Sequence, residues 1–311
     1  MVGDMVTSVR SQLPRAEINE RQVEARGLYG PTSEAWLLNR EAMLLLGAGP
    51  RSLLMQIAHP LIAEGVDQHS DFREDPWRRL AGTIKSYLRI VYGTRSQARG
   101  EIARLNSLHR SIKGGVQDPA AIKASGSSRY SASDPELSLW VHATLVDSTL
   151  VAYDAWIEPL TRVRREAYYA ETRPIGRAFG IGDDLLPADL TAFEDYTARM
   201  VASNGPVQVT PTARELAGCI LHPSLGPILP PLGVLPPTLY DWTFLPAIGL
   251  LPDQLRVEFG LPWTPAHAAV ATWLTTMWRL WRPLLPLRFR TFRQARLAEE
   301  RSDRETTTIA R

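Results

Sequence analysis

From about residue 34 to about residue 203, apolar side chains recur three and four positions apart, and this spacing constrains the fold more than any other feature. It places the apolar side chains on one face of each of several α-helices. The chain shows no sustained alternation of period two, no Asn-Gly or Asp-Gly hairpin turn between β-branched runs, and no GxGxxG or phosphate-binding loop. The sequence therefore predicts an all-α fold and disfavours nucleotide-binding α/β enzymes.

Helix starts are marked by local sequence. The stretches EDPW around Asp75, SDPE around Asp134 and TPAH beginning at Thr264 each place a capping side chain directly before a proline. A capping residue followed by proline in the first turn is typical of a helix N-terminus. These three positions are therefore predicted helix starts.

The chain divides into three parts by composition. We expect an irregular N-terminal arm over residues 1–33, one large helical domain over residues 34–296 and a polar C-terminal tail over residues 297–311. Thr32 or Ser33 can cap the first helix of the domain. The domain is long enough to bury a large core.

Two segments of this domain stand out. Residues 224–252 are rich in proline and large apolar side chains, which predicts an ordered, partly buried connector rather than a long helix. Residues 279–296 carry six arginines and no acid among leucines, phenylalanines and a tryptophan. They could form peripheral contacts with an anionic membrane or a partner, or a terminal helix docked through its apolar face.

Composition excludes several function classes. The 35 basic and 33 acidic residues give a net charge of +2, so no global field favours nucleic acid. The single cysteine, Cys219, excludes an intramolecular disulfide and a cysteine-rich metal site. No run of about 18 apolar residues predicts a transmembrane helix, and the N-terminus lacks the apolar stretch of a secretory signal. We therefore expect a cytoplasmic protein.

Three of the six histidines have informative surroundings. His109 shares an apolar helical face with Ile102 and Leu105, so its imidazole is either hydrogen-bonded in the core or a ligand for a metal or haem iron. His142 lies on a second apolar helix, as a core residue or as the wall of a pocket. His59 precedes a proline, which suits a helix boundary or a kink.

The acidic stretch between Gln56 and Pro76 suggests a metal cluster at first sight. A carboxylate-bridged iron site requires Glu-x-x-His pairs on facing helices, and none occurs in the sequence. The spacing therefore disfavours a metal cluster here.

Arg79 and Thr83 are four residues apart on one predicted helix and share a face, which continues to Tyr87. A guanidinium beside a hydroxyl can orient a carboxylate or a small oxygen ligand. The alternative is a surface arginine paired with Glu74 or Asp75.

Several short motifs in fixed order resemble one known family. They are QIAHPLIAEGVDQHSDF, DPWRRLAGT, VYGT, LHRSIKG, YSASDPELSLWVHATLVDS and YYAETRPIGRAFGI. Together they resemble the oxygenase family of bacterial latex-clearing protein, the rubber oxygenase, and the fungal ER-bound oxygenase of mycophenolic acid biosynthesis. The resemblance covers roughly residues 35–270.

This resemblance implies an all-α fold with a distantly globin-like core around one haem b. His109 matches the proximal iron ligand of the family, and Arg79 and Thr83 match its distal polar residues. His142, His59 and Tyr87 become candidates for the wall of the haem pocket. The implied activity is oxidation or cleavage of a small hydrophobic substrate with O₂.

Two positions qualify what the resemblance implies. Rubber oxygenase has a lysine directly before the distal threonine, where this chain has Gly82, so we expect an open or water-bound sixth iron position. Glu64 is the candidate general base, and the alternative is a glutamate facing solvent at a helix end. The rival functions are a non-catalytic haem- or lipid-binding protein and a haem hydroxylase that uses peroxide.

Overall fold

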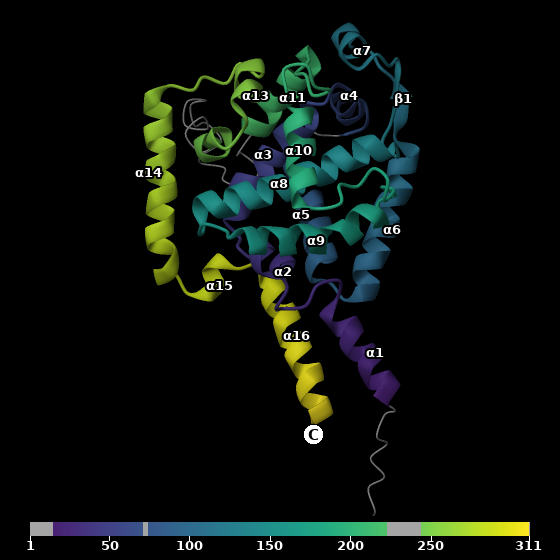
Figure 1. The fold of residues 1–311 in the computed structure, drawn as a ribbon, viewed down its shortest axis with the longest axis vertical. Helices are drawn as coiled ribbons and strands as arrows, with labels where there is room; N and C mark the ends of the chain where they lie inside the picture. Colours follow the sequence, from purple (N-terminus) through teal and green to yellow (C-terminus); the bar gives the residue numbers. More distant parts are fainter. Residues whose placement is uncertain (1–14, 71–73, 223–243, 311) are drawn as a thin grey trace, which may run out of the picture.

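The computed structural model describes residues 15–70, 74–222 and 244–310. Within these ranges the chain is helical apart from one short β-hairpin, which confirms the predicted all-α class (Figure 1). The elements are α1 (Arg15–Arg26), α2 (Glu34–Asn39), α3 (Leu44–Ile57), α4 (Pro60–His69), α5 (Pro76–Tyr92), α6 (Arg95–Ser111), β1 (Lys113–Gly115), α7 (Pro119–Ser125), β2 (Arg129–Ser131), α8 (Pro135–Trp156), α9 (Arg162–Ala178), α10 (Leu190–Met200), α11 (Pro211–Leu221), α13 (Asp253–Glu258), α14 (Pro265–Trp281), the 3₁₀ helix η2 (Arg282–Leu284), α15 (Leu287–Arg290) and α16 (Arg293–Ala310).

The predicted helix starts are confirmed by side-chain caps. Asp75 accepts a hydrogen bond from the backbone N–H of Arg78 at 2.9 Å, and Asp134 accepts one from Glu136 at 2.9 Å. Thr264 caps α14, and Ser33 rather than Thr32 caps α2. Each cap satisfies a backbone donor that the first turn leaves without an intrahelical partner.

Helices α3 and α8 pack against each other at the centre of the core. Trp140 of α8 is fully buried and donates its indole N–H to the carbonyl of Met55 on α3 at 3.0 Å. Buried Arg51 of α3 donates to Ser148 at 2.7 Å and pairs with Asp147 at 2.7 Å. These polar contacts fix the register of two otherwise apolar helices, because buried donors require specific partners.

The hairpin between α6 and α8 was not predicted. Strand β1 pairs antiparallel with β2, with Gly114 opposite Tyr130. A β-carbon at position 114 would lie 2.7 Å from the Tyr130 hydroxyl, so any larger residue there would displace the Tyr130 side chain. Three-residue strands are too short to show alternation in the sequence.

Both chain ends differ from expectation. Helix α1 lies within the arm predicted to be irregular, and α16 extends through the predicted polar tail. The two helices pack together below the body of the protein (Figure 1). Arg301 of α16 donates to the carbonyls of Ala25 at 2.8 Å and Tyr92 at 2.9 Å. Such tertiary contacts stabilise helices that the weak apolar periodicity of these segments did not predict.

Most of the predicted proline-rich connector, residues 223–243, lies outside the described residues. The part that follows is helical over residues 244–249, and Leu245 and Ile248 are buried there. In the described part of the chain, no helix combines the length and apolar character needed to cross a bilayer.

Candidate functional site

His109 lies two residues before the end of α6, on the side that faces α9. A capping box between Thr94 and Gln97 starts this helix. The imidazole is half-buried, and its centroid lies 6.3 Å from that of the Phe179 ring, which follows the last turn of α9. Asn106, one turn earlier, donates to the carbonyl of Ala178 at 2.8 Å and holds the two helices together.

The imidazole of His109 is held in its neutral form. Burial lowers its pKa, and the nearby positive charge of Arg79 lowers it further. None of the hydrogen bonds found among the described residues uses a ring nitrogen of His109. A neutral imidazole with an unengaged nitrogen is the form that binds a metal ion or haem iron.

Arg79 and Thr83 form the pair that their spacing predicts. The Arg79 Nη1 donates to Thr83 Oγ1 at 2.7 Å, and the Thr83 hydroxyl donates to the Arg79 carbonyl at 3.0 Å. Arg79 Nε also donates to Ser70 Oγ at 3.2 Å. Both side chains are exposed.

The start of α5 also carries an ion pair. Asp75 caps the helix and pairs with Arg78 at 3.4 Å. On the same helix, a β-carbon built on Gly82 meets no atom within 4 Å. Position 82 therefore faces open space. Glycine places no amine there, unlike the lysine that rubber oxygenase has directly before the distal threonine.

Tyr87 belongs to the core and not to the open end of α5. Its hydroxyl donates to the side-chain oxygen of Asn39 on α2, and burial raises its pKa well above the ordinary value. It packs against the main hydrophobic core. Its contacts therefore anchor the helix that carries Arg79 and Thr83.

Glu64 is buried, with only 2% of its surface exposed, so the expected solvent-facing alternative is wrong. Its Oε2 accepts hydrogen bonds from the backbone N–H of Gln117 at 2.7 Å and from the Gln68 amide at 2.9 Å. Its Oε1 accepts one longer bond, 3.3 Å, from the backbone N–H of Asp118. Because a carboxylate offers about four acceptor positions, Oε1 retains capacity for a further donor.

His59 and His142 are both buried in neutral form. His59 caps α4, where its Nδ1 accepts from the backbone N–H of Leu61 at 3.3 Å, and burial lowers its pKa to about 4. Burial also lowers the pKa of His142 to about 4. The Nε2 of His142 is buried with no hydrogen-bond partner in the described structure.

The end of α9 connects His142 with His109. A β-carbon on Gly176 would lie 3.5 Å from the Nε2 of His142, and Phe179, three residues on, contacts His109. The positive charge of Arg79 on α5 thus acts on His109 of α6, and His142 lies against Gly176 in the last turn of α9. Sequence reasoning did not single out Gly176 and Phe179, although the motif RPIGRAFGI contains both.

Glu64 occupies a separate position at the hairpin. Its partner Gln68 accepts a hydrogen bond from the Tyr130 hydroxyl at 2.8 Å, and the His69 and Tyr130 rings meet edge to face with centroids 6.1 Å apart. Within the described residues, no group of three or more His, Cys, Asp or Glu side chains is arranged to hold a metal ion.

Comparison with known proteins gives two kinds of match. Residues 36–282 match the model of the catalytic domain described as ER-bound oxygenase mpaB/B'/Rubber oxygenase. Two uncharacterized proteins, one from Mycobacterium bovis and one from Mycobacterium tuberculosis, are each 24% identical over 234 residues, covering 74% of this chain and 85% of theirs. No solved structure matches the chain significantly.

Proposed function

Because the chain belongs to the family of the ER-bound oxygenase and rubber oxygenase catalytic domain, we propose that it is a haem b-dependent oxygenase. In this proposal His109 is the proximal ligand, and the enzyme uses O₂ to oxidise or cleave a small hydrophobic substrate. The observation that carries the proposal is the neutral, unengaged imidazole of His109 beside Arg79. The family membership itself gives the reaction class, oxygenation, and the residues of this chain support the cofactor.

The donor set fits haem b. A histidine nitrogen is a usual axial ligand of haem iron, and an arginine can pair with a propionate or donate to an oxygen ligand. Phe179 supplies an aromatic face next to His109, and Leu139, Ile181 and Leu186 form an apolar cluster near the same helix end. When bound, haem supplies the binding and activation of oxygen.

The protein groups around the site then have distinct tasks. The hydrogen bond from Arg79 to Thr83 at 2.7 Å orients the guanidinium on its helix before a ligand binds. His142 and His59 add neutral nitrogens in buried positions, and Tyr87 fixes α5 to the core. Glu64 is the candidate for accepting a substrate proton at Oε1, since that oxygen carries a single long hydrogen bond.

Haem retention tests the assignment. The wild-type protein, expressed with iron and a haem precursor, should show a Soret absorption band and close to one haem per chain. The His109→Ala variant should lose that stoichiometric haem while keeping its helical circular dichroism. The matched control is His222→Ala, an exposed histidine at the end of α11, which should retain haem.

Two results would contradict the proposal. If the wild-type protein shows no Soret band, the haem assignment is wrong. If His109→Ala retains haem and His142→Ala loses it, His142 and not His109 is the iron ligand. Turnover with O₂ and a reductant, compared with turnover with peroxide, distinguishes the oxygenase from a peroxide-using hydroxylase. An Arg79→Ala variant that binds haem and shows unchanged oxygen affinity would favour a storage or sensing protein.

A further inference from the structure

Helix α14 is apolar but buries very little of its surface. Between Pro265 and Trp278 it contains no Asp, Glu, Lys or Arg. Ala271 is the single residue of this helix that is buried. Trp273, Leu280 and Trp281 are 60%, 62% and 61% exposed. Figure 1 shows the helix at the edge of the molecule, next to α8.

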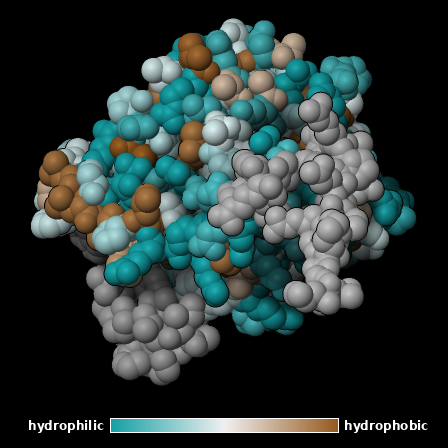
Figure 2. Space-filling model, turned by 90° about the horizontal axis from the view of Figure 1, so that it is seen from below, coloured by the Kyte–Doolittle hydropathy of each residue, from teal (hydrophilic) through white to brown (hydrophobic). Residues whose placement is uncertain are grey.

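The exposed apolar surface continues past the end of α14. Leu284 of η2 is 72% exposed, and Leu287 and Phe289 of α15 are 53% and 64% exposed. In Figure 2 apolar side chains gather at the left, at the edge of the molecule where these elements lie. We call these six residues the apolar ridge: Trp273, Leu280, Trp281, Leu284, Leu287 and Phe289. Apolar side chains gathered on a surface in this way mark an interaction site.

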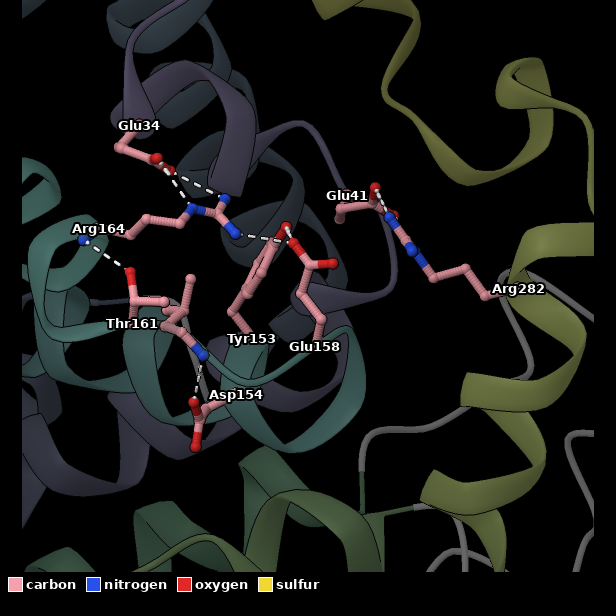
Figure 3. Close-up of polar contacts among 9 residues, drawn as sticks. Glu34, Glu41, Tyr153, Asp154, Glu158, Thr161, Arg164 and Arg282 are labelled. Atoms are coloured by element: carbon pink, nitrogen blue, oxygen red, sulfur yellow. Dashed lines mark hydrogen bonds and ion pairs between the residues drawn. The ribbon is translucent and has the colours of Figure 1, made fainter.

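The surface beside the apolar ridge is basic. Residues 279–296 contain six arginines and no acid. Arg282 is neutralised by the buried carboxylate of Glu41 at 2.6 Å, which pins the segment to the body of the protein (Figure 3). Arg288 and Arg293 are exposed, and Arg288 lies 4.8 Å above the Phe289 ring.

Four of the other five arginines in this region carry uncompensated charge. Among the described residues, no carboxylate lies within ion-pair distance of Arg288, Arg290, Arg293 or Arg296. Arg296 donates to the carbonyls of Arg288 at 2.7 Å and Thr291 at 3.0 Å, which orders the turn without cancelling charge. The complement of this surface is therefore both apolar and anionic.

We propose that the apolar ridge and its arginines dock the protein onto an anionic lipid membrane. A helix of 17 residues extends about 25 Å and can lie in the plane of the membrane, with leucine and phenylalanine at the acyl boundary. Tryptophan prefers the level of the headgroups, and arginine binds their phosphates. The absence of any acid from the segment favours a purely anionic surface over a protein interface of mixed charge. This inference goes beyond the proposed oxygenase function and does not depend on it.

Sedimentation with vesicles tests the proposal. The full-length protein should bind vesicles of equal parts phosphatidylcholine and phosphatidylglycerol, and should bind phosphatidylcholine vesicles far more weakly. The Arg288→Glu/Arg293→Glu variant should bind the anionic vesicles about 25-fold more weakly or worse, because each arginine near such a surface contributes roughly a fivefold effect. The charge-matched control, Lys123→Glu/Arg129→Glu, changes exposed residues at α7 and β2 and should bind as wild type.

A second measurement locates the contact. Phospholipids brominated near the top of the acyl chain quench tryptophans at the membrane interface, and this quenching should fall sharply in a Trp273→Phe/Trp281→Phe variant. Wild-type protein that does not sediment with anionic vesicles would overturn the proposal, as would a charge-reversal variant that binds normally. Concentration-dependent dimerisation that is abolished by Leu284→Ser/Phe289→Ser, without vesicle binding, would instead assign the apolar ridge to self-association.

Discussion

At Glu64 a buried negative charge is balanced by hydrogen-bond donors of the backbone and one amide, not by a cation. The donors come from Gln68 on the same helix and from Gln117 and Asp118, in the loop between β1 and α7. One carboxylate thereby fixes the hairpin relative to α4. Removing a buried acceptor with several donors is destabilising, because each donor left without a partner has lost its hydrogen bond to water and gained none in the protein.

Glu64→Gln should therefore destabilise the protein by about 1–3 kcal/mol, because the new amide places N–H donors against backbone N–H donors. Urea unfolding followed by circular dichroism measures this change. Glu300→Gln, at an exposed position on α16, is the control and should stay within about 0.5 kcal/mol of wild type. Equal stability of the two variants would contradict the structural role, and a folded Glu64→Gln protein without turnover would support Glu64 as the base.

Local residue relationships were predictable, whereas long-range ones were not. The contact between Arg79 and Thr83 follows from helical spacing alone, and it is confirmed at 2.7 Å. Glu64 meets donors more than fifty positions away, and no local pattern encodes such a pairing. The ligand role of His109 stays a prediction, since its environment shows a neutral imidazole and not its partner.

Among the helices, too, features set by neighbouring residues were predictable and features set by distant residues were not. Helix starts were predictable because a cap and its donor are two or three residues apart. The helical state of α1 and α16 depends on tertiary contact: the two helices pack together, and Ala295 and Ala298 of α16 are buried in the main core. Polar helices of this kind gain most of their stability from tertiary packing, so sequence periodicity underestimates them.

The close packing of α3 on α8 predicts the effect of adding one methyl group at Gly47. A β-carbon on Gly47 would lie 2.9 Å from the ring of Trp156, which is itself buried. Gly47→Ala should destabilise the protein by about 1–3 kcal/mol, since overpacking outweighs the gain in helix propensity. Gly100→Ala on α6, where a β-carbon meets nothing within 4 Å, should instead be neutral or stabilising by up to about 1 kcal/mol. Thermal unfolding of both variants checks this, and a stabilised Gly47→Ala protein would contradict the close approach of the two helices at this position.

For the molecule as a whole, all-α class and the central helices were predictable from periodicity. The arrangement of those helices was not, because it depends on buried polar contacts such as that of Trp140 with Met55, which join residues far apart in the chain. The globin-like character of the core stays a prediction, since no solved structure matches. The core nevertheless has a measurable electrostatic property, because it encloses two neutral histidines.

Burial lowers the pKa of both His59 and His142 from 6.5 to about 4. The unfolded chain therefore takes up protons at these residues below pH 6.5 while the folded protein does not, until the pH approaches 4. Stability from each neutral histidine is complete above pH 6.5 and is lost as the pH falls through this window. Between about pH 7 and about pH 5 the free energy of unfolding should drop by about 2 kcal/mol per histidine.

Urea unfolding at these two pH values measures the effect. His142→Leu should reduce the pH-dependent drop by about 2 kcal/mol whatever its absolute stability, since it removes one of the histidines that titrate in this window. His222→Leu, at an exposed position, should keep the full drop. If wild type and His142→Leu show the same difference between the two pH values, His142 is not held neutral by burial, and the apolar surroundings assigned to the end of α9 are wrong.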